Sequence, residues 1–243
     1  MQKICIIVPC YNEAARLRTE TFVSFALAQD RLFLYLVNDG STDDTAVMID
    51  RIVSRLPGRG FSLALKTNHG KAEAVRQGMI RAVQDIPADF FGFWDADLST
   101  PLSEISYLSD GFNDSPSTMA VFGSRVRRLG TDIVRNAWRH YLGRVFSTIA
   151  SLTVGLPVYD SQCGAKIFRR ELVMPLFNEP FVTDWLFDVE LLARMRSLYG
   201  VEQTTRGVYE APLHNWKEVA GSKLRLKHFV LAPIDLLKIY RKY

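Results

Sequence analysis

Two aspartates separated by one small residue, Asp95 and Asp97, follow a short apolar run that ends at Trp94. Their carboxylates are hard oxygen ligands, which suit Mg²⁺ or Mn²⁺. Magnesium keeps several waters and is usually held by one or two carboxylates together with substrate phosphates. A cation held there would offset the charge that builds on a departing diphosphate. In isolation such a pair is more often a solvated turn or a helix cap, so its meaning depends on the elements around it.

The first half of the chain alternates between strand and helix patterns. Apolar runs predict strands at 4–8, 31–37, 62–65, 90–94 and 119–122, and the segments between them predict helices at 13–28, 43–55, 71–83 and 102–112. This alternation predicts an α/β fold with a mostly parallel sheet and helices on both faces. The second half is less regular, with helices expected at 135–153, 184–199 and 226–240 and short strands at 166–168 and 208–211.

Four polar clusters fall at the ends of the first four predicted strands, at 9–13, 38–41, 68–71 and 95–97. In open parallel sheets, ligands bind beyond the carboxyl ends of the strands. Four clusters in order therefore favour a ligand site over a purely structural scaffold.

Individual residues in these clusters suggest roles. Asp39 could accept hydrogen bonds from the edge of a base, or cap the helix that follows it. Tyr11 could stack on a base or simply pack, and Pro9 could shape the turn. Lys71 follows a glycine and could meet a phosphate.

Several nucleotide and hydrolase motifs are absent from the sequence. There is no G-x-G-x-x-G after the first strand and no G-x-x-x-x-G-K-[ST], which argues against a Rossmann dehydrogenase and a P-loop phosphotransferase. There is also no G-x-S-x-G nucleophile elbow.

Taken together, the clusters resemble the GT-A glycosyltransferases of family two, and most closely the dolichyl-phosphate or polyprenyl-phosphate hexose synthases. The similar stretches lie at 8–13, 37–43, 68–71, 95–97, 123–125, 160–166, 185–190 and 216–223. The stretches around Gln162 and Trp216 look more like the glucosyl than the mannosyl synthases. The resemblance implies a single GT-A domain over 1–243, with a nucleotide-sugar half over about 1–124 and an acceptor half over about 125–243.

The resemblance also implies roles for individual residues of this sequence. Those implied to hold the nucleoside and diphosphate are Pro9, Tyr11, Glu13, Asp39, Lys71 and Asp95. Asp95 and Asp97 would contact Mg²⁺ or Mn²⁺, while Gln162 and Lys166 would line the sugar and phosphate pocket. Many mannosyl relatives carry a further metal ligand, Gln, where this chain has Ser99, so a third protein ligand stays open.

The acceptor decides whether a catalytic base is needed. A phosphate monoester has a second pKa of about 6 and is already anionic at neutral pH, so it requires orientation and charge neutralisation. Arginine offers a planar fork to phosphate oxygens, and Arg125 and Arg135 are the expected partners of the acceptor phosphate. Asp160, Asp188 and Glu190 remain candidate bases for a hydroxyl acceptor, although the last two are equally typical of helix-surface or salt-bridge residues.

Charge and composition suggest the partners. The chain has 243 residues, is 48% hydrophobic and carries a net charge of +4. Basic residues concentrate at 125–144 and in the last thirty residues, which suits an anionic partner. The segment around Trp138 and Tyr141 has helical spacing with arginines nearby, typical of a helix lying on an anionic membrane or of an ordinary core-facing helix. Three cysteines without metal-ligand spacing favour a reduced, intracellular protein.

We therefore expect an inverting, metal-dependent transferase that moves a hexose to a polyprenyl or dolichyl phosphate. UDP-glucose is the expected donor from resemblance, and no nucleic-acid partner is expected. The expected location is cytoplasmic, peripheral on the cytoplasmic face of a membrane. Alternatives are transfer to a saccharide or protein hydroxyl, or a nucleotide-sugar binding protein without turnover.

Overall fold

A computed structural model describes residues 2–134, 137–219 and 226–243. The chain divides into two compact units, one made of Met1–Leu98 and Ala165–Pro180 and the other of Ser99–Gly164 and Phe181–Tyr243. The expected halves, about 1–124 and about 125–243, do not coincide with these units. The chain enters the second unit at Ser99 and returns to the first for Ala165–Pro180.

The first unit is built on a sheet whose strands follow the order β3-β2-β1-β4-β7. Their bounds are β1 Ile4–Cys10, β2 Leu32–Asp39, β3 Gly60–Leu65, β4 Phe90–Trp94 and β7 Ala165–Arg169. Strands β1 to β4 run parallel, and β7 pairs with β4 in the antiparallel direction. The predicted α/β class with a mostly parallel sheet is confirmed.

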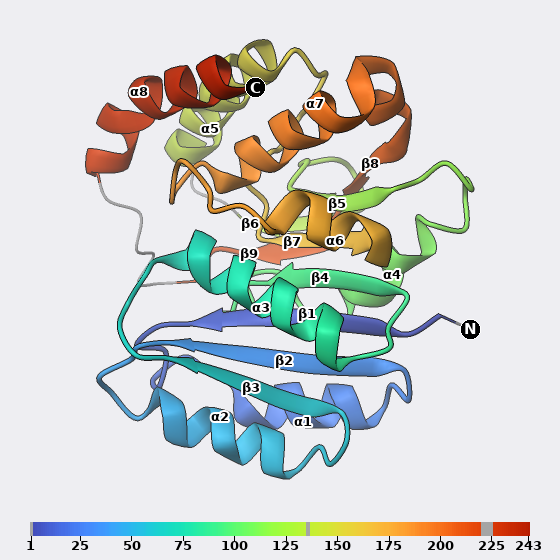
Figure 1. Cartoon of the computed structure of the whole chain (residues 1–243), viewed down its shortest axis with the longest axis vertical. Helices are drawn as coiled ribbons and strands as arrows, with labels where there is room; N and C mark the ends of the chain where they lie inside the picture. The colour runs from blue at the N-terminus through green and yellow to red at the C-terminus, as the bar shows by residue number, and fades with distance from the viewer. Residues whose placement is uncertain (1, 135–136, 220–225) are drawn as a thin grey trace. The chain divides into compact units, whose positions relative to one another are not determined.

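Four helices flank this sheet in the described part of the unit: α1 Thr19–Leu27, α2 Thr45–Ser54, α3 Lys71–Asp85 and α6 Arg170–Phe177. Figure 1 shows α3 and α6 on the near side of the strands and α1 and α2 on the far side. This follows from right-handed crossovers, because the chain steps outward from β1 to β3 and then returns to place β4 beside β1. The reversal creates a switch point at the carboxyl ends of β1 and β4, where ligands bind in open α/β sheets.

Strand β4 is buried in the sheet and ends directly before the aspartate pair. All five of its residues, Phe90–Trp94, are buried, as expected for a strand covered on both faces. A Cβ on Gly92 would lie 2.5 Å from the carbonyl oxygen of Lys166, so glycine permits the close approach of β7.

The second unit contains two parallel strand pairs, β5 (Ala120–Ser124) with β8 (Val208–Pro212) and β6 (Asp132–Val134) with β9 (Asn215–Lys217). Its helices are α4 Glu104–Asp110, α5 Ala137–Val154, α7 Phe187–Gly207 and α8 Leu226–Lys242. Helix α7 is interrupted at Gly200, whose backbone is non-helical with φ 79°. The sequence patterns had predicted only the part of α7 before this break, and they missed β6, β9 and α6.

The predicted helix at 13–28 begins later than expected, because α1 starts at Thr19. The residues before it form turns in which the N–H groups of Arg16 and Leu17 both donate to the Glu13 carbonyl. The backbone of Asn12, with φ 48°, leaves the strand in a left-handed conformation. This segment does not form a helix and contacts the loop that follows β2.

Candidate active site

The loops after β1 and β2 are joined by hydrogen bonds. Asn12 donates its N–H to Ser41 Oγ (3.0 Å) and accepts the N–H of Thr42 through its side-chain oxygen (2.9 Å). The N–H of Glu13 donates to Thr45 Oγ1 at 2.7 Å. These bonds hold 9–13 against 38–45, the two stretches in which the resemblance places most of the nucleoside-binding residues.

Asp43 completes this junction. Its carboxylate accepts the N–H of Ala14 (3.1 Å) and both the N–H and the hydroxyl of Thr45. Desolvation raises the pKa of Asp43, but the hydrogen bonds from Thr45 and Ala14 outweigh it, so the net pKa lies below its usual value.

The loop after β2 is in turn tied to the loop after β3 through Asp39. This side chain is 2% exposed, and its two carboxylate oxygens accept the N–H groups of His69 (2.8 Å) and Gly70 (3.0 Å). Gly70 has φ 92°, a conformation that favours glycine, and directly precedes Lys71, the first residue of α3. Asp39 thus fixes the loop that presents Lys71. A carboxylate oxygen has two lone pairs and can accept more than one hydrogen bond. Recognition of a nucleotide base by Asp39 stays a proposal.

The loops after β3 and β4 meet through an ion pair. The Lys71 ammonium lies 2.5 Å from Asp95 Oδ1, with both side chains about one-third exposed. The same ammonium lies 5.9 Å from the centre of the Phe93 ring. The four predicted clusters therefore form one continuous set of contacts along the carboxyl ends of β1 to β4.

The aspartate pair lies in a tight turn. The N–H of Leu98 donates to the Asp95 carbonyl at 3.2 Å, which encloses Ala96 and Asp97. Leu98 has φ 54°, an uncommon conformation for a residue other than glycine, and such backbone strain often accompanies functional sites.

Asp95 and Asp97 fit a divalent cation by the chemistry of their donors. Within 2–134, 137–219 and 226–243, no three or more His, Cys, Asp or Glu side chains gather in a metal-binding group. A pair of carboxylates still suits Mg²⁺ or Mn²⁺ when diphosphate oxygens and water supply the other ligands. The Ser99 side chain is buried, and its carbonyl accepts the N–H of Lys217 at 2.9 Å.

Lys166, expected near the sugar and phosphate, is fully buried on β7. In the sheet register it lies opposite Phe93, and its ammonium is 5.4 Å from the centre of that ring. The ammonium groups of Lys71 and Lys166 both lie within about 6 Å of the Phe93 ring, the range of cation–π attraction. Two cationic side chains thus lie near Phe93, two residues before Asp95.

In the second unit, Arg125 is held by Asp160. Its Nε and Nη2 donate to the two carboxylate oxygens at 2.7 Å each, and its backbone N–H donates to Oδ2 at 2.9 Å. The side chains are 15% and 6% exposed, so this pair is largely shielded from water. Trp216 adds a ring 5.5 Å from the guanidinium carbon. Asp160, a candidate base for a hydroxyl acceptor in the sequence analysis, orients Arg125.

Two acids that the sequence did not single out support this pair, the half-buried Glu210 and the buried Glu104. Glu210 on β8 accepts the N–H groups of Tyr159 (2.7 Å) and Asp160 (2.8 Å). Glu104 accepts the N–H of Asn215 at 3.1 Å, just before Trp216. Neither acid lies in a recognisable motif, so no local signal could have revealed its role.

Gln162 lies two residues beyond Asp160 and is half-buried. Its amide nitrogen is buried and has no hydrogen-bond partner among the described residues, and the same holds for the hydroxyls of Ser124 and Ser161. Unsatisfied donors of this kind are uncommon in native proteins and suit a site that receives a polar ligand.

The other residues predicted from the sequence differ in their outcomes. Arg135 lies outside the described residues, as do the side chains of Trp138 and Tyr141. Glu190 is fully buried and accepts hydrogen bonds from Arg194 (2.8 Å), the Val182 N–H (2.9 Å) and the Tyr243 hydroxyl (3.0 Å). It is therefore a salt-bridge partner, one of the three interpretations left open.

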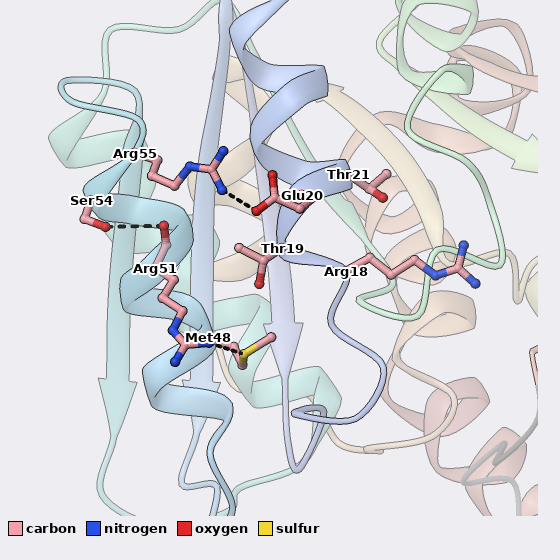
Figure 2. Close-up of a pocket in the computed structure, with 8 residues that line it drawn as sticks. All are labelled: Arg18, Thr19, Glu20, Thr21, Met48, Arg51, Ser54 and Arg55. Carbon is pink, nitrogen blue, oxygen red and sulfur yellow. Dashed lines mark hydrogen bonds and ion pairs between the residues drawn. The ribbon is translucent and has the colours of Figure 1, made fainter.

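A surface depression of about 550 Å³ lies between α1 and α2, and Figure 2 shows the side chains that line it. Its one ion pair in the figure joins Arg55 to the exposed Glu20. None of the predicted site residues lines this depression, so it is separate from the candidate site.

The strand order, the switch point and the joined loops define an α/β protein with the fold of a GT-A transferase. Residues 5–177 match glycosyl transferase family 2. The chain belongs to this family and is a glycosyltransferase.

Several relatives are named dolichyl-phosphate beta-glucosyltransferase. The protein of Saccharomyces cerevisiae is 30% identical over 243 residues, which cover 92% of this chain and 69% of the relative. That of Dictyostelium discoideum is 29% identical, covering 91% of this chain and 68% of the relative. The Homo sapiens protein is 29% identical, with 92% and 70% covered.

Solved structures share the fold. Glucosyl-3-phosphoglycerate synthase from Mycobacterium tuberculosis, in complex with Mn²⁺, UDP and glucosyl-3-phosphoglycerate, aligns with a TM-score of 0.70 at 18% identity, covering 99% of this chain and 79% of that chain. A complex of the same enzyme with Mg²⁺ and UDP gives a TM-score of 0.68. None of the helices in the described part of this chain combines the length and apolar character needed to cross a membrane.

Proposed function

We propose that this glycosyltransferase moves glucose from UDP-glucose to a dolichyl or polyprenyl phosphate, with inversion and with Mg²⁺ or Mn²⁺. The observation that carries the proposal is the continuous set of contacts from Asn12 through Asp39 and Lys71 to Asp95. The names of the relatives, which match more than nine-tenths of this chain, support the glucosyl donor and the lipid-phosphate acceptor.

Residues of the first unit would bind the donor. Pro9, Tyr11, Glu13 and Asp39 would hold the nucleoside, and Asp95 and Asp97 would hold the cation. The cation, when bound, offsets charge on the departing diphosphate. Lys71 would neutralise the diphosphate further, and Lys166 would contribute a buried positive charge on β7.

Residues of the second unit would bind the acceptor. The acceptor phosphate is anionic at neutral pH and serves as its own nucleophile, so no carboxylate base is required. Arg125 would orient that phosphate, because the ion pair with Asp160 fixes the plane of its guanidinium. This pair is neutral overall, so a second positive charge is needed, and Arg135 is the candidate that the sequence offers. The Gln162 amide would donate to a substrate oxygen.

Residues 1–243 would act as a single functional domain, because the first unit would bind the donor and the second unit would bind the acceptor. We place the protein at the cytoplasmic face of a membrane, as a peripheral enzyme, since its acceptor is a lipid.

The test is a product assay over UDP-glucose, UDP-galactose and GDP-mannose, with dolichyl phosphate, free dolichol or no acceptor, and with Mn²⁺ or chelator. We expect a glucosyl phospholipid from UDP-glucose and dolichyl phosphate in the presence of the cation. A product formed equally from free dolichol, or undiminished turnover in chelator, would refute the proposal. Tight UDP-glucose binding without turnover of any acceptor would favour a binding protein.

A further inference from the structure

Helix α5 presents a row of apolar side chains to solvent. Val145, Ile149 and Leu152 are 60%, 48% and 78% exposed. They follow one another by four and three residues, so they lie on one face of the helix. Ala150 and Val154 are buried, which shows that the opposite side of α5 packs into the unit.

Helix α8 has the same arrangement. Its buried side is formed by Leu236 and Ile239, which are 5% and 1% exposed. Its exposed side carries Ile234, Leu237 and Tyr240 at 54%, 47% and 64%. A helix of a globular protein normally turns polar residues to solvent, so this apolar exposed side requires an explanation.

The two helices are neighbours within the second unit, and both are visible in Figure 1. Seven of the sixteen exposed large apolar side chains in the described residues lie on α5 and α8. Single exposed apolar residues are ordinary, but such a concentration marks an interaction surface. We call the exposed residues of these two helices the α5/α8 face.

Basic side chains accompany the apolar residues on α8. Lys238, Arg241 and Lys242 are exposed, and only Lys238 has an acidic partner in the described residues, Asp235 at 2.8 Å. Apolar side chains interleaved with lysine and arginine suit a helix lying in the interface of an anionic bilayer.

We propose that the α5/α8 face docks on the surface of an anionic phospholipid bilayer. The apolar side chains enter the boundary between headgroups and acyl chains, and Arg241 and Lys242 contact lipid phosphates. A second copy of this chain is a poorer occupant, because a twofold contact would bring the basic residues of both copies together. The inference rests on the proposed function only in that a lipid acceptor requires a membrane.

The test is vesicle sedimentation with the purified full chain and phosphatidylcholine vesicles, with and without phosphatidylserine and without any prenyl phosphate. We expect two double variants, Ile149→Gln/Leu152→Gln and Leu237→Gln/Tyr240→Gln, each to lower partitioning at least about tenfold. The matched control is Leu198→Gln/Val201→Gln, which removes apolar residues that are 53% and 48% exposed on α7. Binding like wild type in both test variants, or equal loss in the control, would overturn the proposal.

Charge provides a second arm. Arg241→Gln/Lys242→Gln should weaken binding to vesicles with phosphatidylserine about thirtyfold, since each of the two basic residues near the surface contributes roughly 1 kcal/mol. Binding to pure phosphatidylcholine should change little. If instead the wild type is a dimer by light scattering and the apolar variants become monomers with unchanged vesicle binding, the face is a subunit interface and the proposal fails.

The outcome is separable from the proposed function. The vesicles contain no substrate, so docking is measured whether or not the chain transfers sugar. With a short, water-soluble prenyl phosphate as acceptor, the apolar variants should retain wild-type turnover. The expected result is that the apolar variants lose vesicle binding and keep their turnover of the water-soluble acceptor.

Discussion

The Lys71 ammonium and the Asp95 carboxylate form an ion pair at 2.5 Å, at the point where α3 begins and β4 ends. This pair brings together the two charges that the proposed mechanism uses for different partners, the diphosphate for Lys71 and the cation for Asp95. In that mechanism a divalent cation and Lys71 would compete for the same carboxylate.

Removing Lys71 should separate these two roles. Lys71→Met should bind Mn²⁺ about 1.4- to fivefold more tightly without donor, because a partly exposed ion pair contributes about 0.2–1 kcal/mol. Its turnover of UDP-glucose should fall on the order of 10²-fold, as when one preorganised group that stabilises developing charge is lost. Calorimetric titration and steady-state kinetics measure the two effects. Lys3→Met, an exposed lysine before β1, is the control.

Asp97 should be required for cation use. Asp97→Asn keeps the shape of the side chain but removes the negative charge, so kcat/KM should fall at least about 100-fold. The activation curve in a Mn²⁺ titration should shift to higher concentration, while the circular dichroism spectrum stays the same. Asp50→Asn changes an exposed aspartate on α2 and should behave as wild type. Unchanged Mn²⁺ activation in Asp97→Asn would contradict a metal-binding role.

Asp39 should influence both stability and donor binding. Asp39→Asn replaces one acceptor oxygen with an amide that faces an N–H of His69 or Gly70, leaving a buried donor unsatisfied. The free energy of unfolding should fall by about 1–3 kcal/mol. Because this loop presents Lys71, the KM for UDP-glucose should rise. Urea unfolding and kinetics test both effects, with the exposed Asp44→Asn as the control. A rise in KM without loss of stability would contradict the expected contribution of the two backbone hydrogen bonds to stability.

The Arg125–Asp160 pair should show strong coupling. Arg125→Met removes the guanidinium that faces the buried Asp160 carboxylate and should destabilise the protein by about 3–5 kcal/mol. The double variant Arg125→Met/Asp160→Asn should be less destabilised than the sum of the single changes, which denaturant unfolding can measure. Arg206→Met removes an exposed i,i+4 pair with Glu202 and should change stability by less than about 0.5 kcal/mol. Strict additivity would show that the two side chains are energetically independent.

Much of the first unit was predictable from sequence because its information is local. The apolar run of Phe90–Trp94 forms β4 with the predicted bounds, and α3 starts at the predicted Lys71. Polar residues after buried strands were expected to gather at one edge of the sheet, and they do so because parallel strands bring their carboxyl ends to one edge. The motifs alone were sufficient to predict the family.

The contacts that orient the site were decided by tertiary structure. In the sequence, Asn12 was only part of a motif. In the structure, its side-chain oxygen accepts the N–H of Thr42, 30 positions further along the chain. Arg125 was expected to meet a phosphate, and the structure places it in a buried pair with Asp160, 35 positions further on. Glu210 supports that pair from another 50 positions away. Periodicity and strand-end rules describe neighbours along the chain, whereas pairing between buried charges depends on which distant segments the fold brings within hydrogen-bonding distance.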